Sequence, residues 1–92
     1  MIYFEYSERK INLYTNNGHI YQFYDTIYKL EDKFKKYHFI SSHKAFLVNV
    51  DYIRNIYSND MILEKGIIPI SKLKRKQIKD AYFDAISKEM EI

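Results

Sequence analysis

Apolar and polar positions alternate along the first part of the chain, and this period of two is typical of β-strands. Residues 2–6 (IYFEY), 10–15 (KINLYT) and 19–24 (HIYQFY) are rich in the β-branched and aromatic residues that favour strands. The polar break Ser7-Glu8-Arg9 predicts a tight turn. Asn16-Asn17-Gly18 is a strong hairpin signal, because Asn and Gly tolerate positive φ. The sequence therefore predicts three strands joined by two tight turns.

The apolar period then lengthens to three or four residues. Ile27, Leu30, Phe34 and Tyr37 recur at this spacing, which places them on the buried side of an amphipathic helix. Asp25 precedes the stripe, where a side-chain oxygen can act as an N-cap by accepting amide hydrogens. We therefore expect a helix of about three turns that closes the core.

Short apolar runs separated by turn residues fill most of the second half. Strands are predicted over residues 39–42, 45–48, 53–58, 61–64 and 67–70. A turn or a single helical turn is predicted over 49–52, and turns at Asn59-Asp60 and Lys65-Gly66. Pro69 lacks an amide hydrogen, so it fits the last strand only if that strand lies at a sheet edge.

A second helix is predicted from Ser71, with Ser71 as its N-cap. Its expected apolar stripe is loose and comprises Leu73, Ile78, Tyr82, Phe83 and Ile86. The expected fold class is mostly β: an elongated antiparallel sheet or sandwich of short strands, with one central helix and one C-terminal helix. A chain of 92 residues without repeats or linkers predicts a single domain over residues 1–92.

Composition excludes several kinds of chemistry. The chain has no cysteine, which excludes disulfides, thiolate nucleophiles and cysteine-based zinc sites, and its two glycines form no phosphate-binding loop. His38 and His43 should point to opposite faces of a strand, so they are poorly placed to share a metal. Ser41 and Ser42 lie beside His43 without an orienting acid. We therefore expect neither an enzyme nor a bound cofactor or metal.

The net charge is only +3, but basic residues gather in one segment. Between residues 72 and 79 stand Lys72, Lys74, Arg75, Lys76 and Lys79, with no acid among them. Such a patch is an electrostatic footprint for nucleic acid, although a solvated helix face would look the same. No apolar run approaches the ~20 residues that span a bilayer, and the N-terminus is too polar for a secretory signal. We therefore expect a cytoplasmic protein with no membrane partner.

The segment FISSHKAFLVNVDYI contains an ordered series of an aromatic residue, a histidine, a basic residue, a small residue, an apolar pair, Val-Asn and an isoleucine. The corresponding residues are Phe39, His43, Lys44, Ala45, Phe46-Leu47, Val48-Asn49 and Ile53. This series resembles the LytTR family of bacterial DNA-binding domains. The likeness extends to YFEYSERKINLYT, to the helix with Leu30 and Phe34, and to IPIS at residues 68–71. It therefore covers almost the whole chain.

The resemblance implies a largely antiparallel β fold that binds direct-repeat promoter sites in double-stranded DNA through loops. It also implies the output domain of a response regulator, placed after a phosphorylatable receiver domain, and a homodimer on DNA would fit this arrangement. Family members usually begin about two strands earlier than this chain, so we expect either a shortened variant of the domain or an open sheet edge that partner contacts would cover.

Members of the family contact DNA through three loops, and the resemblance implies the same roles for the matching residues of this chain. In the first loop Arg9 would contact a base, with Lys10 beside it. In the second, Lys44 would contact a phosphate. His43 and Asn49 would be structural, because an imidazole or an amide can satisfy backbone groups of a turn.

The third loop departs from the family pattern. The family commonly has serine followed by two basic residues, whereas this chain reads Ser71-Lys72-Leu73-Lys74. Lys72 or Lys74 could replace the missing base contact, although lysine lacks the planar fork of arginine. The DNA-binding residues expected from this loop are Ser71, Lys72, Lys74, Arg75 and Lys76.

Two alternatives to duplex DNA binding stay open. One is a protein-interaction module that has lost or weakened DNA binding and recruits a partner by strand addition at an open edge. The other is an RNA-binding domain that uses exposed aromatic side chains, since the chain contains ten tyrosines. Most of these tyrosines alternate as core or cross-strand residues would, which favours a structural role for them.

Overall fold

The computed structural model describes residues 1–90, with side chains up to residue 88. Its strands are Tyr3–Ser7 (β1), Lys10–Tyr14 (β2), Ile20–Phe23 (β3), Phe39–His43 (β4), Phe46–Asn49 (β5), Asn55–Tyr57 (β6), Asp60–Leu63 (β7) and Gly66–Pro69 (β8). Its helices are Ile27–Phe34 (α1) and Arg75–Met90 (α2), with single 3₁₀ turns at Lys35–Tyr37 (η1), Val50–Tyr52 (η2) and Lys72–Lys74 (η3). The predicted mostly β class with a central and a C-terminal helix is confirmed.

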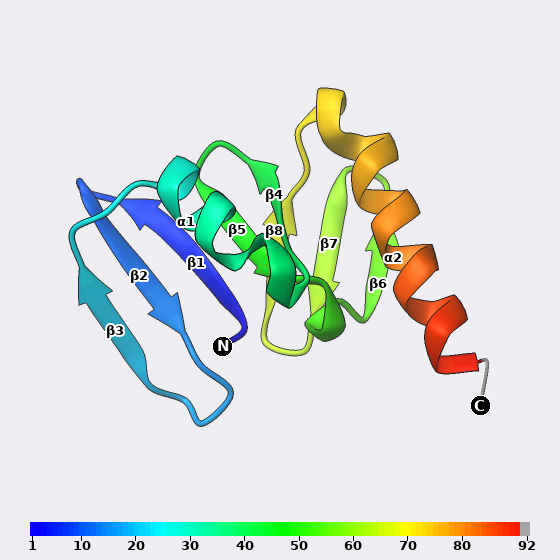
Figure 1. The fold of residues 1–92 in the computed structure, drawn as a ribbon, viewed down its shortest axis with the longest axis horizontal. Coiled ribbons are helices and arrows are strands. Elements are labelled where there is room, and N and C mark those ends of the chain that lie inside the picture. Colours follow the sequence, from blue (N-terminus) through cyan, green and yellow to red (C-terminus); the bar gives the residue numbers. More distant parts are fainter. Residues whose placement is uncertain (91–92) are drawn as a thin grey trace.

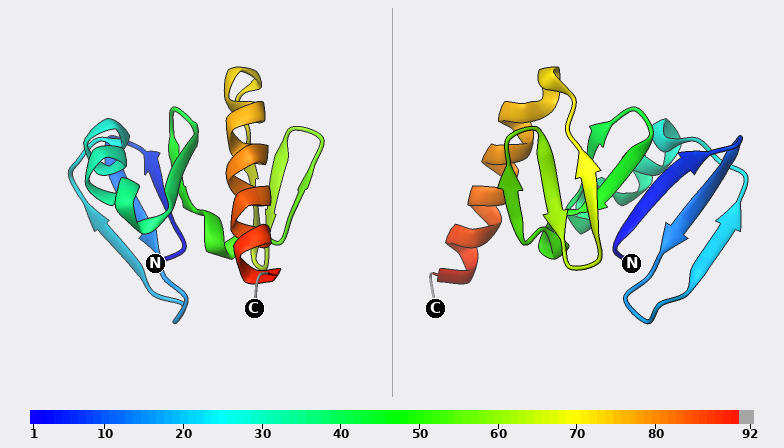
Figure 2. Two further views of the ribbon diagram at one scale, coloured as in Figure 1. Left: turned by 45° about the vertical axis from the view of Figure 1, so that its right-hand side comes forward. Right: turned by 180° about the vertical axis from the view of Figure 1, so that it is seen from behind.

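The strands form two antiparallel sheets (Figure 1). The larger sheet has the order β3-β2-β1-β5-β4, and the smaller has the order β6-β7-β8. Helix α1 packs on the larger sheet, while α2 lies beside the smaller one, as both views of Figure 2 show. All eight strands lie within two residues of the predicted bounds.

Strand β5 joins two hydrophobic cores. Successive side chains of a strand point to opposite faces, so Leu47 and Val48 enter different clusters. Leu47 packs with Phe4 of β1 and Leu30 of α1. Val48 belongs to the cluster that contains Met61 of β7, together with Ile68 and Ile78. At β5 the larger sheet is therefore buried on both faces: the Leu47 side packs against α1, and the Val48 side packs against the smaller sheet and so joins the two sheets.

The first helix is capped by a different residue from the one predicted. Thr26, not Asp25, is the N-cap, and its Oγ1 accepts a hydrogen bond from Lys29 N at 3.2 Å. The backbone of Thr26 is extended (φ −122°, ψ 151°), and this conformation directs an N-cap side chain at the free amides of the first turn. Asp25 Oδ1 instead accepts from Thr26 N at 2.8 Å.

The stripe predicted for the C-terminal helix is partly wrong. Ile78 is fully buried and Tyr82 is half-buried, whereas Leu73 is 96% exposed and Phe83 is 60% exposed. Leu73 belongs to η3, whose three residues per turn break the helical phase with Ile78. Phe83 stands about 100° around the helix from Tyr82, outside the buried stripe.

The start of this helical segment is as predicted, but its capping is not. Ser71 precedes η3, and its side chain makes no capping hydrogen bond. Its backbone carbonyl instead accepts from Lys74 N at 3.0 Å. The Ser71 hydroxyl is therefore not used in closing the first turn.

Two sheet edges bear on the predictions. β8 lies at an edge of the smaller sheet, which confirms the place expected for Pro69. β3 is an edge of the larger sheet, with Ile20 58% and Tyr21 50% exposed. β1, by contrast, is paired on both sides.

Candidate nucleic-acid interface

The three predicted DNA-binding segments lie along one side of the molecule (Figure 1). They are the β1–β2 turn, the β4–β5 turn and the segment between β8 and α2. The β2–β3 and β7–β8 turns lie on the opposite side, as the second view of Figure 2 also shows.

The first turn consists of only two residues, Glu8 and Arg9, because Ser7 pairs with Lys10. Glu8 has φ 53° and Arg9 has φ 66°. Two positive φ values in succession identify a type I′ turn, which usually contains Asn-Gly and which side chains larger than glycine disfavour. This strained turn presents Arg9 to solvent.

Lys10 lies beside this turn but is only half-exposed. Its Nζ is 5.7 Å from the centroid of the Tyr24 ring. A cation over an aromatic face is attracted by the negative electrostatic potential of that face, which arises from the quadrupole of the ring. The Lys10 ammonium is thus drawn towards the connection between β3 and α1, while Arg9 is left at the tip.

The second turn, Lys44-Ala45, joins β4 to β5 next to a register shift between Ser41 and His43. Ala45 N donates to His43 Nδ1 at 3.3 Å, and the His43 ring lies edge-on to Phe46 with centroids 6.1 Å apart. His43 therefore stabilises the turn through this hydrogen bond and this ring contact. Lys44 is exposed at its tip.

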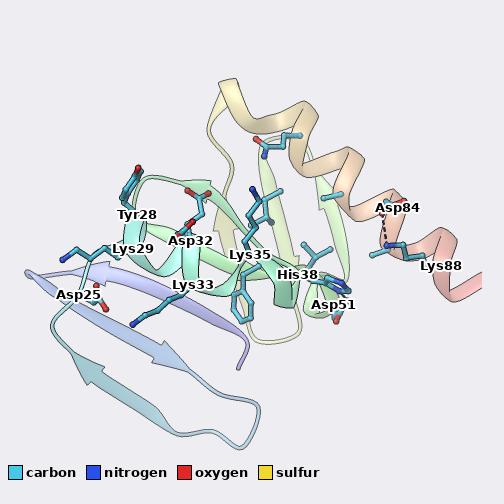
Figure 3. A pocket seen from close by; sticks show the side chains of 17 residues that line it. Asp25, Tyr28, Lys29, Asp32, Lys33, Lys35, His38, Asp51, Asp84 and Lys88 are labelled. Carbon is cyan, nitrogen blue, oxygen red and sulfur yellow. Dashed lines mark ion pairs between the residues drawn. The ribbon is translucent and has the colours of Figure 1, made fainter.

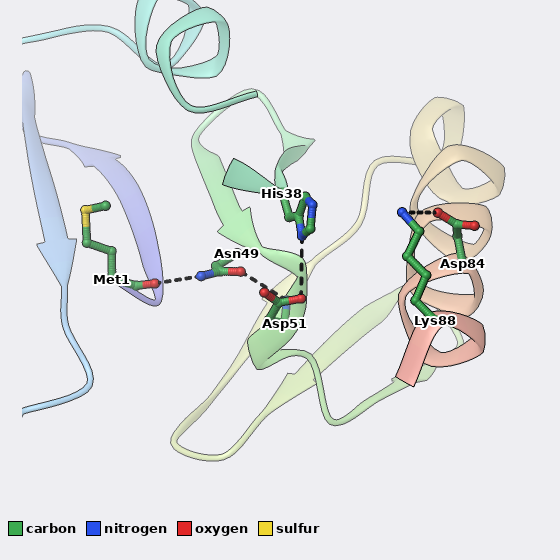
Figure 4. Close-up of polar contacts among 6 residues, drawn as sticks. All are labelled: Met1, His38, Asn49, Asp51, Asp84 and Lys88. Carbon is green, nitrogen blue, oxygen red and sulfur yellow. Dashed lines mark hydrogen bonds and ion pairs between the residues drawn. The ribbon is translucent and has the colours of Figure 1, made fainter. Parts of the chain in front are cut away.

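Asn49 lies at the other end of β5 (Figure 4). Its Oδ1 accepts from Asp51 N at 3.1 Å, and its Nδ2 donates to the carbonyl of Met1 at 3.1 Å. His38 Nδ1 lies 3.9 Å from Asp51 Oδ1, and a dashed line in the same figure marks this contact. These contacts place Asn49 between the N-terminal strand and η2, away from the side that carries the three segments.

The basic residues of the third segment differ in exposure: two are exposed to solvent and two are partly covered. Lys72 and Lys76 are exposed. Arg75 is half-exposed, and Lys74 Nζ lies 3.9 Å from Glu31 Oε2 of α1. Lys74 is consequently directed at α1, and it would have to leave this pair to reach a phosphate.

Backbone hydrogen bonds hold the three segments side by side. Tyr6 N, near the first turn, donates to Ala45 O of the second turn at 2.8 Å. Ser71 N of the third segment donates to Ser42 O, near the second turn, at 2.8 Å. We call these segments, Glu8-Arg9, Lys44-Ala45 and residues 71–76, the three-turn row.

The structure adds a fourth turn that the sequence did not assign to a site. The β6–β7 turn lies on the same side as the row (Figure 1). Asn59 O in this turn accepts from Ile70 N at 2.7 Å, and neighbouring Tyr57 is 73% exposed. The turn itself was predicted, but its place depends on pairing between distant parts of the chain, which no local pattern shows.

A broad groove of about 1160 Å³ separates α1 from α2 (Figure 3). Its lining carries both signs of charge, including Lys33, Lys35, Asp32 and an Asp84–Lys88 pair at 3.5 Å. Mixed charges do not produce the single-sign potential that attracts a polyanion. The three-turn row is therefore the better candidate for a nucleic-acid interface.

Other kinds of site find no support in the described residues. These residues contain no group of three or more potential metal-ligating side chains from His, Cys, Asp and Glu. None of the helices within residues 1–90 is long and apolar enough to cross a membrane.

Comparison with known proteins identifies the fold and the family. No curated protein matches the chain. Among solved structures, a LytTr DNA-binding domain from Bacillus cereus, assigned to a methyl-accepting/DNA response regulator, matches with a TM-score of 0.77 and 21% identity, over 87% of this chain and 78% of that one. At this identity the likeness shows a shared fold. The LytTr DNA-binding domain family matches residues 1–82. The resemblance found in the sequence is thus confirmed, and the chain belongs to the LytTr DNA-binding domain family.

Proposed function

We propose that this chain binds double-stranded DNA sequence-specifically, as the output domain of a transcription regulator. The observation that carries the proposal is the three-turn row, in which backbone hydrogen bonds align three exposed basic turns on one side. Aligned cations attract the phosphate backbone, and side chains between them can reach base edges. Membership in a family of DNA-binding domains supports the same function.

The surroundings of each residue suggest its role. Arg9 is exposed at the tip of a two-residue turn, and its planar fork suits the O6 and N7 atoms of guanine. Lys44, Lys72 and Lys76 are exposed and suit phosphates as point charges. Ser71 has a hydroxyl that is not used in capping, so it can donate to a phosphate oxygen.

Three residues are less free to bind. Arg75 is half-exposed, Lys10 lies over Tyr24, and Lys74 is paired with Glu31. The Lys74 pair is 3.9 Å long and partly exposed, and such pairs are worth little. We expect Lys10 and Arg75 to contribute through their positive charge at longer range, and Lys74 to exchange Glu31 for a phosphate when DNA approaches.

We further propose that the DNA site is a pair of direct repeats. Two copies of the domain with the same orientation would then occupy successive sites, as a dimer or as neighbours on DNA. An upstream receiver domain in the same regulator would control this pairing. These proposals rest on the family resemblance and on the presence of one three-turn row in each copy of the domain.

Selection of the 92-residue chain against a random duplex pool at moderate salt tests the proposal. Recovery of a pair of direct repeats would support both DNA reading and its arrangement. A single enriched motif would support DNA reading and overturn the repeats. No enrichment over random DNA would favour the protein-interaction alternative, while displacement of the selected duplex by unrelated single-stranded RNA would favour the RNA alternative.

A further inference from the structure

Leu73 is an unusual side chain in the three-turn row. It is 96% exposed, more than any other large apolar side chain described in residues 1–88. Exposed apolar residues are common when they stand singly on a surface. Leu73, however, stands between Lys72 and Lys74, where the surface is otherwise cationic.

The local backbone explains why Leu73 points away from the protein. η3 has three residues per turn, so Lys72, Leu73 and Lys74 project in three different directions. Lys74 is directed at Glu31 of α1. The exposure of Leu73 shows that no other element covers its side chain.

The chemistry of DNA limits what an apolar side chain can read. In the major groove, base edges present hydrogen-bond donors and acceptors, and the C5-methyl group of thymine is the apolar group among them. The side chain of leucine cannot form hydrogen bonds, but it can exclude water from a methyl group. The lysines beside it would hold the neighbouring phosphates.

We propose that Leu73 is a specificity-determining residue that contacts the C5-methyl group of thymine in the major groove. The inference rests on the proposed DNA binding and goes beyond it, because it assigns a base and an atom to one side chain. The third segment would thus select thymine by apolar contact, while Arg9 in the first turn selects guanine by hydrogen bonds.

Deoxyuridine tests this contact, because it differs from thymidine only by the missing C5-methyl group. The duplex recovered by selection is prepared with deoxyuridine at each thymine in turn, and its affinity for the 92-residue chain is measured. We expect at least one position at which the wild-type protein loses affinity by about two- to fourfold. Leu73→Ala should lose a similar factor on the thymine duplex and should then show no further loss with deoxyuridine at that position.

Two other variants make the result specific. Leu73→Met keeps an apolar tip and should retain the deoxyuridine loss. Ile67→Ala removes another exposed apolar side chain, which is 65% exposed in β8, and should behave as wild type. Since Leu73 is almost fully exposed, its variants should fold as the wild type does.

The outcomes separate this inference from the proposed function. If wild type and Leu73→Ala lose equally with deoxyuridine, or if neither loses, the thymine contact is wrong and DNA binding stands. If the chain enriches no duplex at all, both the contact and the proposed function are wrong.

Discussion

Arg9 occupies a backbone conformation that its side chain disfavours. Its φ of 66° follows the 53° of Glu8, and a non-glycine residue in the left-handed region raises the energy of the fold by about 1 kcal/mol or more. A type I′ turn of this kind usually contains glycine at its second position. A contact between its guanidinium and DNA would give a functional reason for an arginine at this tip.

Arg9→Gly should therefore raise the free energy of unfolding by about 1 kcal/mol, because glycine adopts positive φ without a steric penalty. The same variant should lose specific DNA affinity, by roughly 1–3 kcal/mol if a bidentate guanine contact is removed. Urea denaturation and DNA titration measure the two effects separately.

Arg9→Ala is the matched control, since alanine removes the guanidinium but keeps the strain. It should lose DNA affinity without the gain in stability. If Arg9→Ala bound the selected duplex as tightly and selectively as wild type, the base-reading role of Arg9 would be wrong.

Two buried serines next to the second turn provide another test. Ser42 is fully buried, and its Oγ has no hydrogen-bond partner among the described residues, whereas Ser41 Oγ donates to His43 O at 3.1 Å. An unsatisfied buried hydroxyl is destabilising by about 1 kcal/mol or more. Ser42→Ala should therefore increase the free energy of unfolding, and Ser41→Ala should decrease it.

Denaturant melts of both serine variants check this prediction. DNA affinity should not change in Ser42→Ala, because its link to Ser71 uses the backbone carbonyl. If Ser42→Ala destabilised the fold as much as Ser41→Ala, the Ser42 hydroxyl must have a partner.

At the scale of elements, the pairing of β1 with β2 makes the stability of the fold depend on pH in the alkaline range. Tyr3 and Tyr14 are cross-strand partners whose rings stack at 4.4 Å, and Tyr14 OH donates to Glu5 Oε1 at 3.1 Å. Burial, together with the negative charges of Tyr14 and Glu5, raises the pKa of Tyr3 from 10.0 to about 12. Burial also raises the pKa of Tyr14.

The direction of this pH dependence follows from the number of protons that the folded and unfolded states bind. Between pH 10 and about 12 the folded protein keeps the Tyr3 proton, whereas an unfolded tyrosine releases it. Unfolding therefore releases a proton in this range, and stability falls as pH rises. Urea midpoints measured across this range should fall less steeply in Tyr3→Phe than in wild type. Tyr57→Phe, which changes a 73% exposed ring, should follow wild type; equal slopes in all three proteins would contradict the prediction.

Local patterns were sufficient to predict most elements, because strand and turn signals act over a few residues. The hairpin through Glu8 and Arg9 and the edge position of Pro69 follow directly from such signals. The cap of α1 could not be chosen by pattern, since Asp25 and Thr26 are both good caps and only the extended backbone of Thr26 decides. The exposure of Leu73 was missed for a similar reason, because a 3₁₀ turn precedes α2 and changes the helical phase.

At the scale of the whole molecule, the three-turn row depends on contacts that no local pattern reveals. The pairing of β1 with β5 brings Tyr6 to Ala45, and the link between Ser42 and Ser71 brings the third segment beside them. Family resemblance predicted that these loops act together. The hydrogen bonds that align them, and the added β6–β7 turn, required the structure.

The row also predicts how binding responds to salt. Each lysine or arginine that neutralises a phosphate displaces counterions. For each such contact, a tenfold rise in salt concentration should therefore lower the affinity about tenfold. Lys76→Ala should weaken binding on all duplex sequences and should lower the slope of log affinity against log salt by about one.

Lys65→Ala is the matched control for this titration. Lys65 is exposed, like Lys76, but it lies in the β7–β8 turn on the opposite side of the molecule. Its removal changes the net charge equally and should leave the salt slope unchanged. Equal effects of both variants would indicate attraction by net charge rather than contact through the row.

The hydrogen bonds that align the row have a consequence for how such a domain can diverge. They join the backbone of Tyr6 to Ala45 and of Ser71 to Ser42, so they tolerate side-chain replacement at the tips. Arg9, Lys44 and Leu73 could therefore be exchanged one at a time without shifting their neighbours. If they read DNA, new target preferences could evolve or be engineered in separate steps, with nearly additive effects on affinity.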